Sequence, residues 1–173
     1  AQWIRGPSLN GDDADKLFDE VHPNDCQQGG VGNCWLIAAI ASVAEFPSVI
    51  ERLFEPKTVA LEGKYTITLY DVRTSSWNDV VIDDLIPCEP LQPWEKDATP
   101  VFSKPQGNEL WVLLMEKAFA KFVGTYGDLS GGQTSWAWQA LTGVEEQIWY
   151  TRQQGKWKKC VLNPERQREM MRS

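Results

Sequence analysis

The sequence has only one histidine, His22, among its 173 residues. A metal site built from several histidines is therefore excluded. A Ser–His or Cys–His catalytic pair would need either His22 or a histidine outside this chain. The four cysteines form no Cys-x-x-Cys pair, so the sequence predicts neither a disulfide scaffold nor a structural zinc site. Reduced thiols are typical of intracellular proteins, and we expect a cytoplasmic location.

Cationic residues are scarce too, since 17 Lys and Arg face 24 Asp and Glu and give a formal net charge of -7. A nucleic-acid partner is not expected, because such a partner requires cations that neutralise phosphates. The sequence likewise offers no polybasic attraction to an anionic membrane surface. No apolar run approaches the roughly 20 residues of a membrane-spanning helix, so no membrane segment is expected.

Hydrophobic residues make up 42% of the chain, and its length suffices for one domain with a sizeable core. The first 30 residues are polar, so we expect residues 1–24 to form an N-terminal arm that adds nothing to the core. Residues 33–45 are apolar almost throughout and rich in alanine, which favours a buried central helix. Asn33 is a suitable N-cap for that helix. Pro47 should end it, with a short helix following toward Phe54.

The remaining sequence mixes strands and helices. Near-alternating β-branched and aromatic residues at 64–73 and 77–87 predict an antiparallel hairpin. A helical period returns at 109–123, where Glu116 is expected on the polar side, and a third helix should end at Gly143. A short charged helix is expected from Asn163. The predicted fold class is therefore α+β, with helices around a small antiparallel hairpin.

The most informative segment is Gln28-Gly29-Gly30-Val31-Gly32-Asn33-Cys34-Trp35. It places Cys34 in the first turn of a buried helix, where backbone N–H groups and the helix dipole favour a thiolate. The same N–H groups can donate to the oxyanion formed when the sulfur attacks a carbonyl. Gln28 can supply a second donor if the loop curls back. A cysteine beside a tryptophan is also common as a small core residue, so the residues alone leave both roles open.

With these residues the chain resembles the calpain family of papain-like cysteine proteases. QGGVGNCWLIAAIAS is similar to the family's nucleophile segment, and VVIDDLIP at 80–87 resembles a strand of its hairpin. GNELWVLLMEKAFAKFVGTYGDLSGGQTS at 107–135 resembles the second helix and the loop after it. The resemblance implies the N-terminal lobe of a papain-like protease. It assigns residues 25–150 to that lobe and residues 151–173 to a C-terminal extension that leads toward a second lobe.

The resemblance also implies roles for individual residues. Cys34 matches the nucleophile of the family, and Gln28 matches the oxyanion-hole glutamine. Gly132 matches a position whose backbone binds extended substrate, where a glycine permits close approach. Trp35 matches the tryptophan that packs at the cleft, although plain core packing explains a tryptophan at this position equally well. Proteins are the substrates that these matches imply.

One calcium ion in this lobe is a further implication of the resemblance, with side-chain ligands that match Asp25 and Glu109. Calcium prefers several carboxylate and carbonyl oxygens from separate loops. The sequence alone favours plain structural roles, with Asp25 as a turn residue and Glu109 at a helix start, where acids are favoured anyway. Pro23 replaces an arginine that the family links to calcium-driven closure of two lobes, so this switch is expected to differ or to be lost. Asn33 is a milder departure from the family's common aspartate.

A thiol protease needs a histidine to transfer protons and a third group to orient it. In the calpain family both come from a second lobe, whereas here no histidine follows Cys34 and His22 matches no catalytic position. We therefore expect the first catalytic lobe of a calcium-regulated cysteine endopeptidase, inactive alone and completed by a second lobe of the same parent chain. A catalytically inert calpain-like binding or structural module is the alternative, and a cysteine-dependent acyl transferase is a third. Retention of Gln28 and Cys34 favours the protease.

Overall fold

The fold is known from a computed structural model, which describes residues 1–9, 16–92, 94–95, 97–104 and 107–162. Its helices and strands confirm the predicted α+β class. The charged helix expected from Asn163 lies outside the described residues. None of the described helices is long and apolar enough to cross a membrane. The proposed boundaries at residues 24/25 and 150/151 stay predictions.

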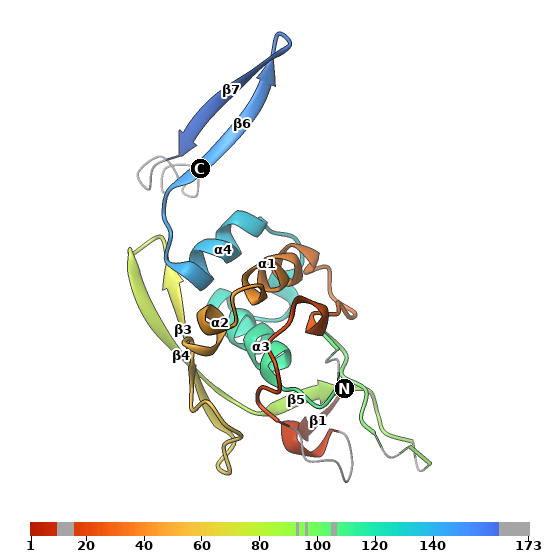
Figure 1. Cartoon of the computed structure of the whole chain (residues 1–173). Coiled ribbons are helices and arrows are strands. Elements are labelled where there is room, and N and C mark those ends of the chain that lie inside the picture. Colours follow the sequence, from red (N-terminus) through yellow and green to blue (C-terminus); the bar gives the residue numbers. More distant parts are fainter. Residues whose placement is uncertain (10–15, 93, 96, 105–106, 163–173) are drawn as a thin grey trace.

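In the described ranges, four α-helices form the body of the molecule, with α1, α3 and α4 gathered around one core (Figure 1). They are α1 (Cys34–Ala44), α2 (Pro47–Glu51), α3 (Trp111–Val123) and α4 (Thr134–Thr142). Pro47 opens α2, where its missing N–H costs nothing. Gly143 ends α4 as predicted, in the left-handed conformation with a φ of 74°.

The predicted hairpin is present as β3 (Lys64–Asp71) paired with β4 (Ser76–Asp83). Its antiparallel register runs from Lys64 opposite Asp83 to Asp71 opposite Ser76. A short strand, β2 (Phe54–Glu55), completes a sheet of order β2-β3-β4. The predicted second strand is in fact divided, because β5 (Leu85–Cys88) leaves this sheet and pairs with β1 (Gln2–Arg5).

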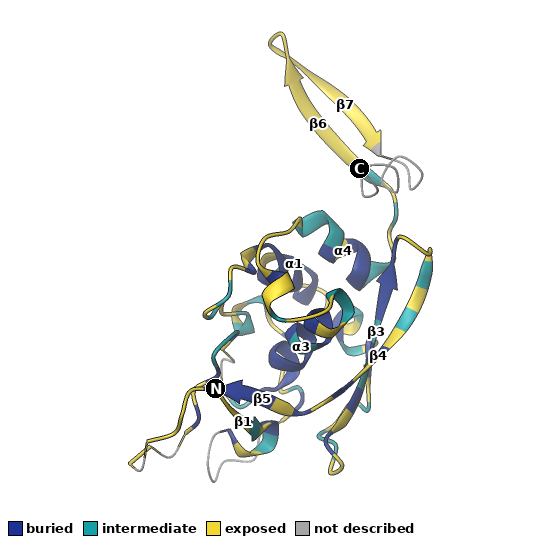
Figure 2. Cartoon of the chain, turned by 180° about the vertical axis from the view of Figure 1, so that it is seen from behind, coloured by how far each residue is buried: buried dark blue, intermediate teal, exposed yellow. Residues whose placement is uncertain are grey.

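The core lies between the helices and the inner face of the hairpin, and Figure 2 shows buried residues on α1, α3 and β3. Leu36 and Ile40 of α1 are fully buried. The expectation of a helix buried on all sides needs a correction, because Cys34, Ala38 and Ser42 are exposed. These three residues recur every four positions and therefore form one narrow exposed strip on the helix.

The N-terminal segment also differs from expectation. Leu9, Leu17 and Val21 are between 1% and 3% exposed and belong to the same core as the helices. The prediction that the arm adds nothing to the core was therefore wrong.

A second hairpin follows α4 and was not predicted. It consists of β6 (Gln147–Gln153) and β7 (Lys156–Leu162), paired from Gln147 opposite Leu162 to Gln153 opposite Lys156. Gln154 and Gly155 form its two-residue turn with φ values of 49° and 77°, the conformation that a tight hairpin favours. The hairpin projects away from the helical body (Figure 1), and nearly all of it is exposed (Figure 2).

Candidate active site

Cys34 is the first residue of α1, and its side chain is exposed. The first helical turn is closed by the amides of Leu36 and Ile37, which donate to the Asn33 carbonyl over 2.9 and 3.1 Å. The predicted helix start is thus confirmed to the residue. A thiol at this end of an 11-residue helix faces the positive end of the helix dipole and is accessible to a substrate.

The side chain of Gln28 folds onto the glycine loop that precedes Cys34. The Gln28 side chain is exposed, and its Nε2 donates to the Val31 carbonyl over 2.9 Å. A primary amide carries two N–H bonds, and the bond to Val31 uses only one of them. Gln28 therefore lies on the same tight turn that leads into α1, with one amide hydrogen left for another acceptor.

The glycines of this loop are required by its close approach to residues 101–102. A Cβ atom on Gly29 would stand 1.4 Å from the carbonyl oxygen of Phe102. The amide of Gly30 donates to the Val101 carbonyl over 2.9 Å. Any side chain at position 29 would separate the two segments, so the loop conformation depends on that glycine.

A second glycine loop lies beside the first, and both meet Trp35. The Gly131 amide donates to the Gly32 carbonyl over 3.0 Å. A Cβ on Gly132 would stand 2.4 Å from Cε2 of Trp35. Trp35 is buried, and its Nε1 donates to the Leu129 carbonyl over 2.8 Å. The structure therefore brings Cys34, its glycine loop, Trp35 and Gly132 together, although Trp35 is a core residue that lies behind the glycine.

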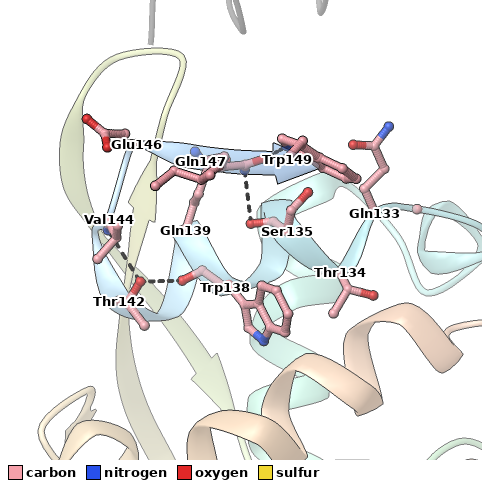
Figure 3. Close-up of a pocket in the computed structure, with 12 residues that line it drawn as sticks. Gln133, Thr134, Ser135, Trp138, Gln139, Thr142, Val144, Glu146, Gln147 and Trp149 are labelled. Carbon is pink, nitrogen blue, oxygen red and sulfur yellow. Dashed lines mark hydrogen bonds between the residues drawn. The ribbon is translucent and has the colours of Figure 1, made fainter. Parts of the chain in front are cut away.

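A cavity of about 660 Å³ opens next to Gly132, between α4 and the beginning of β6 (Figure 3). Trp138 and Trp149 are among its apolar lining residues, together with Val144 and Ile148, and Thr134 and Ser135 line it near the start of α4. The Gln147 side chain crosses the cavity wall and donates to the Ser135 carbonyl over 3.4 Å. The cavity thus combines apolar indoles with backbone and hydroxyl groups, as ligand-binding clefts commonly do.

The remaining thiols lie in different surroundings. Burial raises the pKa of Cys26 to about 12, and the charge of Asp25 adds to the effect. Burial alone raises the pKa of Cys88 to about 11. Cys160 is exposed, but it lies in the middle of β7. Cys34 is therefore the one cysteine of the chain that is both exposed and located at a helix N-terminus.

Asp25 and Glu109, the two predicted calcium ligands, lie in one acidic region. Residues 16–20 run beside residues 108–110, which places the amides of Asp19 and Glu20 on Oε1 of Glu109. Burial raises the pKa of Glu109, and the nearby charge of Asp25 raises it further. Asp25 closes the single-turn helix η2 (Pro23–Asp25), where its Oδ2 accepts from the His22 amide over 2.7 Å.

These hydrogen bonds limit how the two carboxylates can hold a cation. Oε1 of Glu109 accepts two amides and has no lone pair to spare, whereas Oε2 accepts, from the residues that the structure describes, only the Trp111 indole, over 3.2 Å. Glu109 can therefore offer one lone pair, on Oε2, to a cation. Among the described residues, no group of three or more His, Cys, Asp and Glu side chains is placed to hold a metal ion. Two carboxylates fit a calcium ion only if carbonyl and water oxygens complete its shell.

The His22 side chain serves as the cap of η2. Its Nδ1 accepts from the Asn24 amide over 3.1 Å and caps η2. A neutral imidazole that accepts through Nδ1 carries its proton on Nε2, so it has no second lone pair to offer. His22, the one histidine among the 173 residues, is thus engaged by the backbone at the start of η2.

One residue was assigned to the wrong environment by sequence reasoning. Glu116 was expected on the polar side of α3, but it is 1% exposed and accepts hydrogen bonds from Asn33 and Ser103. Asn33 precedes Cys34 as expected, yet its side chain makes no N-cap bond and donates to Glu116 instead. The helical period of α3 could not predict the burial of Glu116, because its hydrogen-bond partners come from other parts of the chain.

Comparison with known proteins agrees with this geometry. The family model described as "Calpain family cysteine protease" matches residues 1–173. The calpain-1 catalytic subunit of Rattus norvegicus is 39% identical over 136 residues, which cover 78% of this chain and 18% of the relative. Its Homo sapiens counterpart is 37% identical over the same length. The calpain-type cysteine protease DEK1 of Arabidopsis thaliana is 37% identical over 149 residues, 83% of this chain and 6% of the relative. The chain thus spans less than a fifth of these relatives.

Proposed function

The chain belongs to the calpain family of cysteine proteases, and we propose that it is the first catalytic lobe of an intracellular, cytoplasmic calpain-type endopeptidase that is regulated by calcium. The observation that carries this proposal is the placement of an exposed Cys34 at the start of α1, with Gln28 folded onto the turn before it. A calpain-like module without catalysis would need neither the thiol nor the amide.

In the proposed reaction, Sγ of Cys34 attacks the carbonyl carbon of a peptide bond. The carbonyl oxygen becomes an oxyanion that accepts from the Cys34 amide and from the second N–H of Gln28 Nε2. The C–N bond then breaks, the amine leaves with a proton, and an acyl-enzyme remains on the sulfur. Water hydrolyses this thioester and restores the thiol.

The proton transfers in this scheme require a histidine from outside the 173 residues, since His22 is engaged through Nδ1. We propose that a second lobe of the same parent chain supplies that histidine and the asparagine that orients it. The lobe alone should therefore not degrade casein. Rapid proteolysis that disappears in Cys34→Ala would contradict this part of the proposal.

The proposed role of Cys34 can be tested on this chain alone. Iodoacetamide at neutral pH should alkylate Cys34 faster than Cys160, because only Cys34 lies at a helix N-terminus. Mass spectrometry of the two peptides gives both rates in one experiment. Cys34→Ala and Cys160→Ser are the matched controls that assign the fast and the slow reaction. Equal rates at the two sulfurs would contradict the proposed nucleophile and favour the inert module.

We propose that Gly132 binds extended substrate through its backbone. The support is its position at the edge of the cavity beside α4, on the surface of Trp35. Trp35 then contributes to substrate binding indirectly, by supporting this glycine from behind. Protein substrates are consistent with an open cleft that presents backbone groups and two exposed indoles.

Calcium would be held in this proposal by Oε2 of Glu109 and by the carboxylate of Asp25. The ion would lower the repulsion between the two acids and link η2 to the start of α3. Isothermal titration calorimetry of this chain with CaCl2, with Asp25→Ala as the control, tests the site. Heat of binding in the parent chain and none in the variant is expected. Absence of heat at millimolar calcium would remove the metal from the proposal.

A further inference from the structure

Glu116 is a carboxylate that is buried in the middle of the lobe at a considerable energetic cost. Burial raises its pKa, and the hydrogen bonds from Ser103 and Asn33 act against that rise. Its side chain also lies in the same small enclosed space as Phe102 and Tyr126, whose rings stack at 4.2 Å. Packing alone does not explain a buried carboxylate here, whereas the hydrogen bonds that Glu116 accepts do.

The first set of bonds reaches the residue that precedes the nucleophile. Oε1 of Glu116 accepts from Nδ2 of Asn33 over 2.6 Å. Asn33 is fully buried, and its carbonyl accepts the amides of Leu36 and Ile37 that close the first turn of α1. Glu116 therefore holds in place the residue on which the start of α1 is built.

The second set of bonds reaches the segment that supports the glycine loop. Oε2 of Glu116 accepts from the Ser103 amide over 3.0 Å and from its hydroxyl over 2.8 Å. The same segment accepts the Gly30 amide through Val101 and donates from Lys104 to the Gln27 carbonyl over 3.0 Å. Gln28 lies between these two anchors of the loop.

We propose that Glu116 is a positioning residue that fixes Cys34 relative to Gln28. The carboxylate of Glu116 on α3 links the start of α1 to the segment of residues 101–104, which supports the glycine loop. The distance between Sγ of Cys34 and the side-chain amide of Gln28 is therefore kept constant. A group that must be held to a fraction of an ångström needs such rigid support. The inference rests on the proposed function, because it assigns Glu116 to the same pair of residues.

Amide hydrogen exchange measured by NMR on this chain tests the inference. Glu116→Met keeps the length of the side chain and removes every acceptor, and Asn33→Ala removes the donor at the other end. Each variant should speed exchange at Leu36 and Ile37 by about tenfold, because losing a buried hydrogen bond loosens that turn. Exchange at Val43, near the end of α1, should stay within about twofold.

Ser103→Ala is the matched control, because it removes one hydrogen bond to the same carboxylate and leaves the bond to Asn33. It should leave exchange at Leu36 and Ile37 within about twofold of the parent chain. The inference is overturned if Glu116→Met speeds exchange equally along α1, or if Ser103→Ala has the same effect on the first turn. If Glu116→Met does not fold, Asn33→Ala carries the test alone.

A second readout separates this inference from the proposed function. In a Cys160→Ser background, alkylation of Cys34 should slow by about fivefold in Glu116→Met, since the loosened turn no longer holds the sulfur against its N–H groups. Slow alkylation already in the parent chain would contradict the proposed nucleophile but leave the exchange result to decide the role of Glu116. Fast alkylation that is unchanged in Glu116→Met would overturn the inference alone.

Discussion

Gly132 offers a stringent test of how the cleft is built, through the substitution Gly132→Ala. The added Cβ would stand 2.4, 2.7 and 2.8 Å from three atoms of the Trp35 indole. Carbon atoms normally stay about 3.5 Å or more apart, so the indole would have to move by about 1 Å. Gly132 is not in a left-handed conformation, and the cost of the alanine is therefore steric.

The indole cannot move away without loss. Its Nε1 donates to the Leu129 carbonyl over 2.8 Å, and its ring stacks on Trp136 with centroids 5.5 Å apart. Overpacking a tight core costs about 1–3 kcal/mol, and stretching a buried hydrogen bond adds about 1 kcal/mol. We therefore expect Gly132→Ala to lower the free energy of unfolding by roughly 2–4 kcal/mol.

Urea denaturation followed by far-UV circular dichroism gives this number. Gly131→Ala is the matched control, because that glycine has a φ of 79° and a Cβ added there would meet nothing within 4 Å. It should cost about 1–2 kcal/mol through the backbone alone. In a Trp35→Leu background, which removes the clashing ring atoms, Gly132→Ala should cost less than about 0.5 kcal/mol. An equal cost in both backgrounds would refute the steric explanation.

Three further predictions concern other parts of the lobe. Leu17→Ala should lower the free energy of unfolding by about 2–5 kcal/mol, as substitutions of core leucines do. Leu61→Ala, at a residue that is 96% exposed, should change it by under about 0.5 kcal/mol. Equal effects in urea denaturation would contradict the burial of the N-terminal segment. Trp157→Ala, on the exposed hairpin, should change the free energy of unfolding by no more than about 0.5 kcal/mol. A larger loss would show that the Trp157 side chain packs against other residues. The guanidinium of Arg73 hydrogen-bonds to Asp71 and lowers the pKa of that carboxyl, so the pair stabilises the fold above the ordinary carboxyl pKa and loses its effect as the pH falls through the lowered pKa. Arg73→Gln should therefore cost up to about 1 kcal/mol at pH 7 and progressively less as the pH is lowered. A cost in urea denaturation that does not fall with pH would refute the pairing.

Local patterns predicted those features that depend on neighbouring residues. The glycine loop and the apolar run after Asn33 were enough to start α1 at Cys34, and alternation was enough to pair β3 with β4. The β6–β7 hairpin was missed although Gln154-Gly155 is a turn dipeptide, because its exposed strands lack the alternation that burial imposes.

Features that depend on distant residues could not be predicted in this way. Glu116 lies 83 positions from Asn33 and 13 from Ser103, and only the folded chain shows that both point their donors at one carboxylate. The same holds for the two acids of the proposed calcium site. Sequence reasoning could name Asp25 and Glu109 from resemblance, but it could not show that backbone amides already occupy one oxygen of Glu109.

The projecting β6–β7 hairpin has a consequence for how the lobe behaves in concentrated solution. Each of its strands keeps one edge that pairs with no other strand in the described part of the chain, and such edges invite pairing between molecules. The hairpin residues 147–162 carry Arg152, Lys156, Lys158 and Lys159 and no acid. Two hairpins that meet therefore repel each other through like charges, and salt weakens this repulsion. Added salt should therefore increase any association between molecules through this hairpin.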